Sequence, residues 1–108
     1  MANPMAGEVG IVLDGQPVTA KLTLGALAEL EAGLAEAPGD GGLMALIGRF
    51  ETGAFSQRDV LAVLVAGLRG GGWQGGVTDL LTVEIGGGPA GAARVAAELL
   101  LRAFRGAE

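Results

Sequence analysis

One stretch of the chain matches a ligand-binding motif. The glycine-rich run from Gly70 to Gly75 satisfies the pattern G-x-G-x-x-G, which binds a dinucleotide pyrophosphate where a strand leads into a helix. Here an apolar helical pattern precedes the run, and Trp73 would crowd a phosphate. We therefore interpret residues 70–76 as a flexible Gly-rich loop, and we expect no nucleotide, no other cofactor and no small-molecule substrate.

Side chains for catalysis or metal binding are scarce. The chain has no His, no Cys and no Tyr, which excludes Ser-His-Asp and Cys-His nucleophiles, His-ligated or thiolate metal sites and disulfides. Asp40, Asp59 and Asp79 lie in or near the first turns of expected helices, where free N–H groups and the helix dipole account for them. Glu29 and Glu31 are two residues apart on a helix and diverge. We expect no catalytic residues, no metal site and no enzymatic activity.

The charge balance excludes further partners. Twelve acidic and seven basic residues give a net charge of −5, and the single Lys and six Arg are scattered along the chain, so we expect no nucleic-acid binding. The longest uncharged apolar run, nine residues between Asp59 and Arg69, is about half of the roughly 20 needed to span a bilayer. No basic residue or apolar run precedes Glu8. We therefore expect a cytoplasmic protein without a secretory signal or a membrane contact.

The first part of the chain has the pattern of a β-hairpin. Apolar side chains recur with a period of two in residues 9–13 and 18–22, and Asp14-Gly15 lies between these stretches. An Asp-Gly pair between two such runs favours a tight turn, because Gly adopts positive φ without steric cost. We predict a hairpin over residues 8–22.

The rest of the chain has mostly helical spacing. Thr23 can cap a first helix, Ser56 and Asp59 resemble a capping box, and Gly70 can end the following helix in the left-handed conformation. Residues 77–88 fit both a short helix begun at Thr78 and a strand. The expected helices cover residues 24–34, 43–50, 57–69 and 89–105, with a loop at 37–42. The first should bury a stripe of Leu24, Leu27, Ala28, Leu30 and Leu34.

These elements predict an α+β architecture. A chain of 108 residues has the size of one ordinary domain. An isolated hairpin is marginal in water, so it must pack against helices. We therefore expect a single domain over residues 1–108, with a hairpin at 8–22 packed on four to five short α-helices in a predominantly helical part at 23–105.

Two features suggest contacts with another protein. Trp73 is the only Trp, and in a glycine-rich run it is either tucked back onto the domain or displayed to a partner. The last helix carries more apolar residues than one core face needs, so it is either a core helix or one that faces a partner or a second copy of the chain. The candidate partner-binding residues are Trp73, Leu100, Leu101 and Phe104.

Several segments in the first two thirds of the chain resemble a known family. They read GEVGIVLDG at 7–15, LTLGALAELE at 22–31, GRFETG at 48–53, RDV at 58–60 and AGLR at 66–69. Together they are similar to the small gene-transfer-agent and phage tail protein family, labelled as tail tube proteins and encoded beside the tape-measure gene. The likeness covers residues 7–69 well and the last helix loosely, while residues 70–88 are richer in glycine than the family pattern.

The resemblance implies a non-enzymatic role in tail assembly. It points to a tail assembly chaperone that acts in the cytoplasm and binds the tape-measure protein, the tail tube protein or both. The alternative is a structural tail tube component that stays in the tail of the particle, although a tube subunit would need a broader sheet than one hairpin. A regulatory or toxin–antitoxin module is the remaining class, and neighbouring genes for tail proteins would exclude it.

Overall fold

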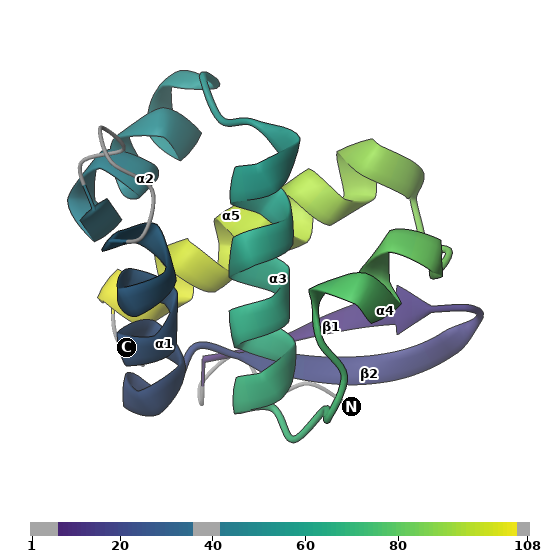
Figure 1. The fold of residues 1–108 in the computed structure, drawn as a ribbon. Helices are drawn as coiled ribbons and strands as arrows, with labels where there is room; N and C mark the ends of the chain where they lie inside the picture. The colour runs from purple at the N-terminus through teal and green to yellow at the C-terminus, as the bar shows by residue number, and fades with distance from the viewer. Residues whose placement is uncertain (1–6, 36–41, 106–108) are drawn as a thin grey trace.

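The computed structural model describes residues 7–35 and 42–105. In these residues a two-stranded antiparallel sheet precedes five helices, as Figure 1 shows. This confirms the mostly helical α+β fold with an N-terminal hairpin. Asp40, and all of the expected loop at 37–42 except Gly42, lie outside the described residues. The elements are β1 (Glu8–Leu13), β2 (Gln16–Lys21), α1 (Leu24–Ala35), α2 (Gly42–Thr52), α3 (Gln57–Gly70), α4 (Val77–Thr82) and α5 (Gly88–Arg105).

The hairpin forms around the predicted turn. Leu13 pairs with Gln16, and the two residues between them, Asp14 and Gly15, have φ values of 50° and 81°. Two successive positive φ values define the tight turn whose twist matches that of the flanking strands. On β1, side chains at alternate positions are buried, which gives the hairpin one core face; these are Val9, Ile11 and Leu13.

Residues 77–88 combine both of the predicted alternatives. α4 is a short helix, and after it Ile85 forms an isolated antiparallel bridge with Leu13. The Asp14 N–H donates to the Glu84 carbonyl at 2.8 Å, and the Gly86 N–H donates to the Val12 carbonyl at 2.9 Å. A few residues after α4 therefore extend the sheet beyond β1.

The cap of α4 is not Thr78. The helix begins at Val77 with Gly76 as its N-cap, and the Asp79 carboxylate accepts a 2.7 Å hydrogen bond from the Gly76 N–H. Asp79 therefore stabilises the first turn as expected, but the N-cap residue whose N–H it accepts from is a glycine and not a residue with a hydroxyl side chain. Glycine is itself an accepted N-cap residue.

α3 lies at the centre of the core. It packs against β2, α1 and α5, and Figure 1 shows α5 crossing behind it. A Cβ at Gly67 would come within 2.6 Å of Leu99 Cδ1, so this glycine lets α3 and α5 approach closely. The buried residues of the two helices include Val60, Val63, Leu64, Leu68, Val95, Ala96, Leu99 and Leu100.

The first helix, α1, is capped as predicted, but it buries a different set of residues from the one expected. Thr23 Oγ1 accepts from the Ala26 N–H at 3.1 Å. The expected stripe is wrong at Leu24, which is 84% exposed, and at Ala28, which is also exposed. The residues that α1 buries recur every four positions and are Ala26, Leu30 and Leu34. This row faces α3 and α2, with which α1 has its main helix contacts.

The end of α3 also differs from the prediction. Gly70 stays in the helix, Gly71 is the C-cap with φ −87°, and Gly72 has the positive φ of 105°. The Trp73 N–H donates to the Leu68 carbonyl at 2.9 Å and the Gly72 N–H to the Arg69 carbonyl at 3.1 Å. This is the Schellman pattern, two residues later than expected. Any of three successive glycines can take the left-handed position, so local sequence does not select one.

Candidate functional site

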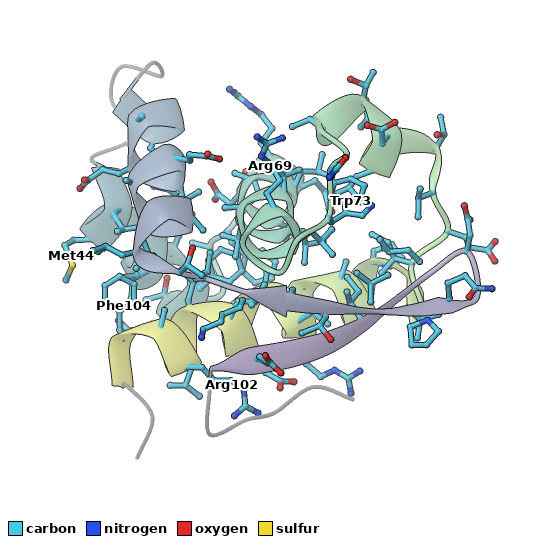
Figure 2. All side chains as sticks on the ribbon, turned by 90° about the horizontal axis from the view of Figure 1, so that it is seen from below. Met44, Arg69, Trp73, Arg102 and Phe104 are labelled. Atoms are coloured by element: carbon cyan, nitrogen blue, oxygen red, sulfur yellow. The ribbon has the colours of Figure 1, made fainter. Side chains whose placement is uncertain are left out.

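Exposed apolar side chains gather where α5 ends. Leu101 and Phe104 are three residues apart on α5 and are 50% and 49% exposed. Met44 on α2 is 73% exposed, and Figure 2 shows it at the same end of the molecule as Phe104. We call Met44, Leu101 and Phe104 the apolar end. Grouped exposed apolar side chains on a folded domain are typical of an interaction surface.

Leu100 lies apart from this surface. It is only 4% exposed and belongs to the hydrophobic core. Each residue turns a helix by about 100°, so the neighbouring residues Leu100 and Leu101 face different directions. Leu100 anchors α5 from inside, and of the two leucines only Leu101 is placed to touch a partner.

Trp73 is half-buried and packs against the core. The Schellman turn directs its backbone back toward α3, and a Cβ at Gly75 would collide with the six-membered ring of the indole. Glycine at 75 therefore lets the chain pass closely over the ring. The Gly-rich segment, expected to be a flexible loop, thus packs on the domain here. Of the two alternatives for Trp73, the structure has the tucked one, with part of the ring still at the surface.

A partly buried ion pair joins α2 to α3. Asp59 is 7% exposed, and its carboxylate accepts two hydrogen bonds of 2.9 Å from Arg49, through Nε and a terminal nitrogen. Asp59 also accepts from the Ser56 N–H at 2.9 Å, and its own N–H donates to Ser56 Oγ at 3.1 Å, which confirms the capping box. The Arg49 hydrogen bonds lower the pKa of Asp59; burial opposes them, and the Ser56 N–H adds to the lowering.

Three other carboxylates are engaged away from this pair. Glu29 pairs with Arg69 at 3.4 Å, Glu98 pairs with Arg102 at 3.4 Å as the four-residue spacing predicts, and Asp79 caps α4. Within residues 7–35 and 42–105, no cluster of three or more carboxylates is placed to hold a metal ion. No helix among these residues is both long and apolar enough to cross a bilayer.

A comparison with protein-family models places the chain in a family. The model described as phage tail tube protein, GTA-gp10, matches residues 6–106, nearly the whole chain. The chain belongs to this family. The match extends through residues 70–88, where the resemblance read from the sequence is weakest. Comparisons with curated proteins and with solved structures found no match.

Membership of the GTA-gp10 family identifies a tail protein, of a kind that is generally structural or assembly-related and non-catalytic. For this family member, the excess of apolar residues on the last helix predicted Leu101 and Phe104 as contact candidates, and the structure places both at the surface. The sequence did not single out Met44, because the surrounding apolar spacing resembles an ordinary core helix. It also missed the Arg49–Asp59 pair, since these residues are ten apart and on different helices.

Proposed function

We propose that this chain is a non-enzymatic tail assembly chaperone that binds the tape-measure protein, the tail tube protein or both during assembly in the cytoplasm. The observation that carries the proposal is the apolar end. Met44, Leu101 and Phe104 are 73%, 50% and 49% exposed on a domain that has a well-formed core elsewhere. Such a surface is suited to cover apolar helical segments until they assemble.

The charge of the chain supports this role. A net charge of −5 disfavours self-aggregation of a domain that exposes apolar side chains. Glu98 and Arg102 form an ion pair on α5 beside the apolar end, which provides a polar border. Trp73 is a secondary contact candidate because part of its ring is at the surface, while Leu100 contributes only by holding α5 in place.

Co-expression with the adjacent tape-measure and tail tube proteins tests the proposal. The chain is purified through a tag, and the co-purifying protein is identified and quantified. A chaperone recovers soluble tape-measure or tube protein in a complex that is absent from mature particles. Failure to recover either protein, or presence of the chain at tube stoichiometry in mature tails, would contradict the chaperone role.

Matched variants locate the contact. Leu101→Asp and Phe104→Asp should each reduce recovery of the partner by about tenfold or more, because a charge would be buried at the interface. Trp73→Ala should reduce it less. Leu81→Asp is the control, since Leu81 on α4 is 63% exposed and outside the apolar end. Circular dichroism and thermal melting establish that each variant is folded.

The alternative role, a structural tail tube component, is favoured by the description of the family, phage tail tube protein. A tube subunit must associate with copies of itself in rings. Electron microscopy and sedimentation of the purified chain test this role: stacked rings support it, whereas a monomer or small complex in the presence of the tape-measure protein supports the chaperone.

A further inference from the structure

A second apolar surface lies between α1 and α3. It is an open groove of about 570 Å³ on the side of α3 away from the hairpin. Leu30, Gly33 and Leu34 form the α1 wall, and Leu61, Ala62 and Val65 form the α3 wall. None of these six residues belongs to the apolar end.

The α3 wall is less buried than the rest of that helix. Val60, Val63 and Leu64 are at most 2% exposed, whereas Leu61, Ala62 and Val65 are only half-buried although they lie on the central helix of the fold. From Arg58 at one end of the groove to Val65, the wall runs for about 10 Å, or two helical turns. A groove of this length fits the apolar stripe of one helix.

The charges at the two ends of the groove differ. Arg58 lines the end at the start of α3, is exposed, and has no ion-pair or hydrogen-bond partner among residues 7–35 and 42–105. Arg49 at the same end is neutralised by Asp59. At the other end, Glu29 is already paired with Arg69. α1 runs antiparallel to α3 and ends where α3 begins, so the dipoles of the two walls oppose each other here. Arg58 is therefore the charge by which this end of the groove attracts a carboxylate.

We propose that the groove binds an amphipathic helix of a partner protein, one that has apolar residues at i, i+3, i+4 and i+7 and carboxylates in its last turn. The helix runs antiparallel to α3, so its C-terminal end, with its carboxylates and negative dipole, lies against Arg58. Its apolar stripe covers Leu61, Ala62 and Val65. The groove is separate from the apolar end, so this inference goes beyond the proposed function and does not depend on it.

A synthetic peptide provides the probe. It has about 15 residues, Leu at i, i+3, i+4 and i+7, two Glu in its last turn, Ala and Gln elsewhere, and a side-chain lactam on its outer face that keeps it helical. Two further peptides replace the Leu by Ala or the two Glu by Lys. Binding of each labelled peptide to the full chain is measured by fluorescence anisotropy. The Glu peptide should bind tightest, the Lys peptide several-fold more weakly, and the Ala peptide not measurably.

Variants of the chain place the peptide in the groove. Ala62→Glu should weaken binding of the Glu peptide by about tenfold or more, because it puts a charge in the apolar wall. Arg58→Glu should weaken it by about fivefold and make the Lys peptide the tighter ligand, since the charge pair is reversed. Leu24→Glu, at an 84% exposed site that does not line the groove, is the matched control and should leave binding unchanged.

Three outcomes would overturn the inference. The first is equal binding of the Glu and Lys peptides to the unaltered chain. The second is binding of the Ala peptide as tightly as the Leu peptides. The third is loss of binding on Phe104→Asp with no effect of Ala62→Glu, which would move the peptide to the apolar end. The peptide comparisons need no variant, so the test stands even where a substitution impairs folding. Recovery of the tape-measure protein is measured separately and bears only on the proposed function.

Discussion

The two ends of α3 are fixed by opposite means. At its start, Ser56, Asp59 and Arg49 form a set of hydrogen bonds and an ion pair that joins α2 to α3. At its end, glycines lie directly against the outer edge of β2, where side chains would not fit: a Cβ at Gly70 or Gly71 would collide with the carbonyl oxygen of Lys21 or Thr19. The first end depends on charge, and the second depends on the absence of a side chain.

The difference decides which end tolerates change. Side chains can move or exchange partners, so the loss of one hydrogen bond at the start of α3 has a moderate effect. A carbonyl in a paired strand cannot move without disturbing the strand, and a methyl group added against it meets backbone instead of a flexible group. We therefore expect substitutions at the C-terminal glycines to be the most damaging.

The largest expected effect is that of Gly71→Ala. Gly71 has φ −87°, which alanine adopts readily, so the cost arises from the collision with Thr19. We expect the free energy of unfolding to fall by about 3 kcal/mol, measured by urea denaturation. Gly48→Ala on α2 is the control: a Cβ there meets nothing within 4 Å, so it should stabilise the protein by about 0.8 kcal/mol. Equal effects of the two changes would contradict the packing explanation.

Asp59→Asn should have the next largest effect. The amide keeps the shape of the carboxylate but leaves Arg49, which is 24% exposed, without its counter-charge. We expect a loss of about 2 kcal/mol, again by urea denaturation. Glu98→Gln removes a more exposed pair, so it should cost less than about 0.5 kcal/mol. A similar small loss at Asp59 would show that the ion pair is not what holds the start of α3.

The pH dependence of stability sharpens the same point. The pKa of Asp59 is lowered in the folded protein, chiefly by Arg49, so the unfolded state binds more protons in acid. Its contribution is complete above the unfolded pKa of about 3.9 and is lost as the pH falls toward the lower folded value. The difference in unfolding free energy between the unaltered protein and Asp59→Asn should therefore shrink below about pH 4. A difference that stays constant from neutral pH to pH 3 would contradict this assignment.

Ser56→Ala tests the N-cap of α3 separately from the Arg49–Asp59 ion pair. It removes the acceptor for the Asp59 N–H but leaves the Arg49 contacts, so the loss should be about 1 kcal/mol. Thr78→Ala is the matched control, because Thr78 is exposed and does not cap α4. Thermal melting of both variants separates the cap from a general effect of losing a hydroxyl group.

Apart from the control substitutions, Gly75→Ala should have the smallest effect on stability. The added Cβ would meet the ring of Trp73, and a side chain at the surface can move away where a strand carbonyl cannot. We expect a loss of about 0.5 kcal/mol, accompanied by a red shift of fluorescence as the only Trp becomes more exposed. A loss as large as that of Gly71→Ala would mean that Trp73 is as fixed as β2.

The same contrast explains what could be predicted from the sequence. The start of α3 follows from residues three apart, Ser56 and Asp59, and the hairpin follows from Asp14-Gly15 and a period of two. The end of α3 could not be predicted in this way, because three successive glycines are locally equivalent. Only contact with β2, about 50 residues earlier in the chain, distinguishes them. The bridge of Ile85 to Leu13 is non-local for the same reason.

The candidate surfaces follow a similar rule. An excess of apolar residues on the last helix indicated Leu101 and Phe104, but helical spacing alone does not say which neighbour faces outward, and Leu100 proved to be buried. The half-buried stripe of α3 that lines the groove could not be predicted from the sequence, for a different reason. A helix that is apolar around most of its circumference predicts a central core helix, and nothing local marks the side that no neighbour covers.

The hydrogen bonds between the hairpin turn and the segment after α4 also order events during synthesis. Asp14 and Glu84 are 70 residues apart and share two of these bonds. The hairpin leaves the ribosome early, but the Asp14 N–H gains its partner only after Glu84 has emerged, and the Val12 carbonyl only after Gly86. Core packing of α5 comes later still. Folding of this domain is therefore completed only near the end of translation of residues 7–105, and nascent chains stalled before residue 84 should remain sensitive to protease.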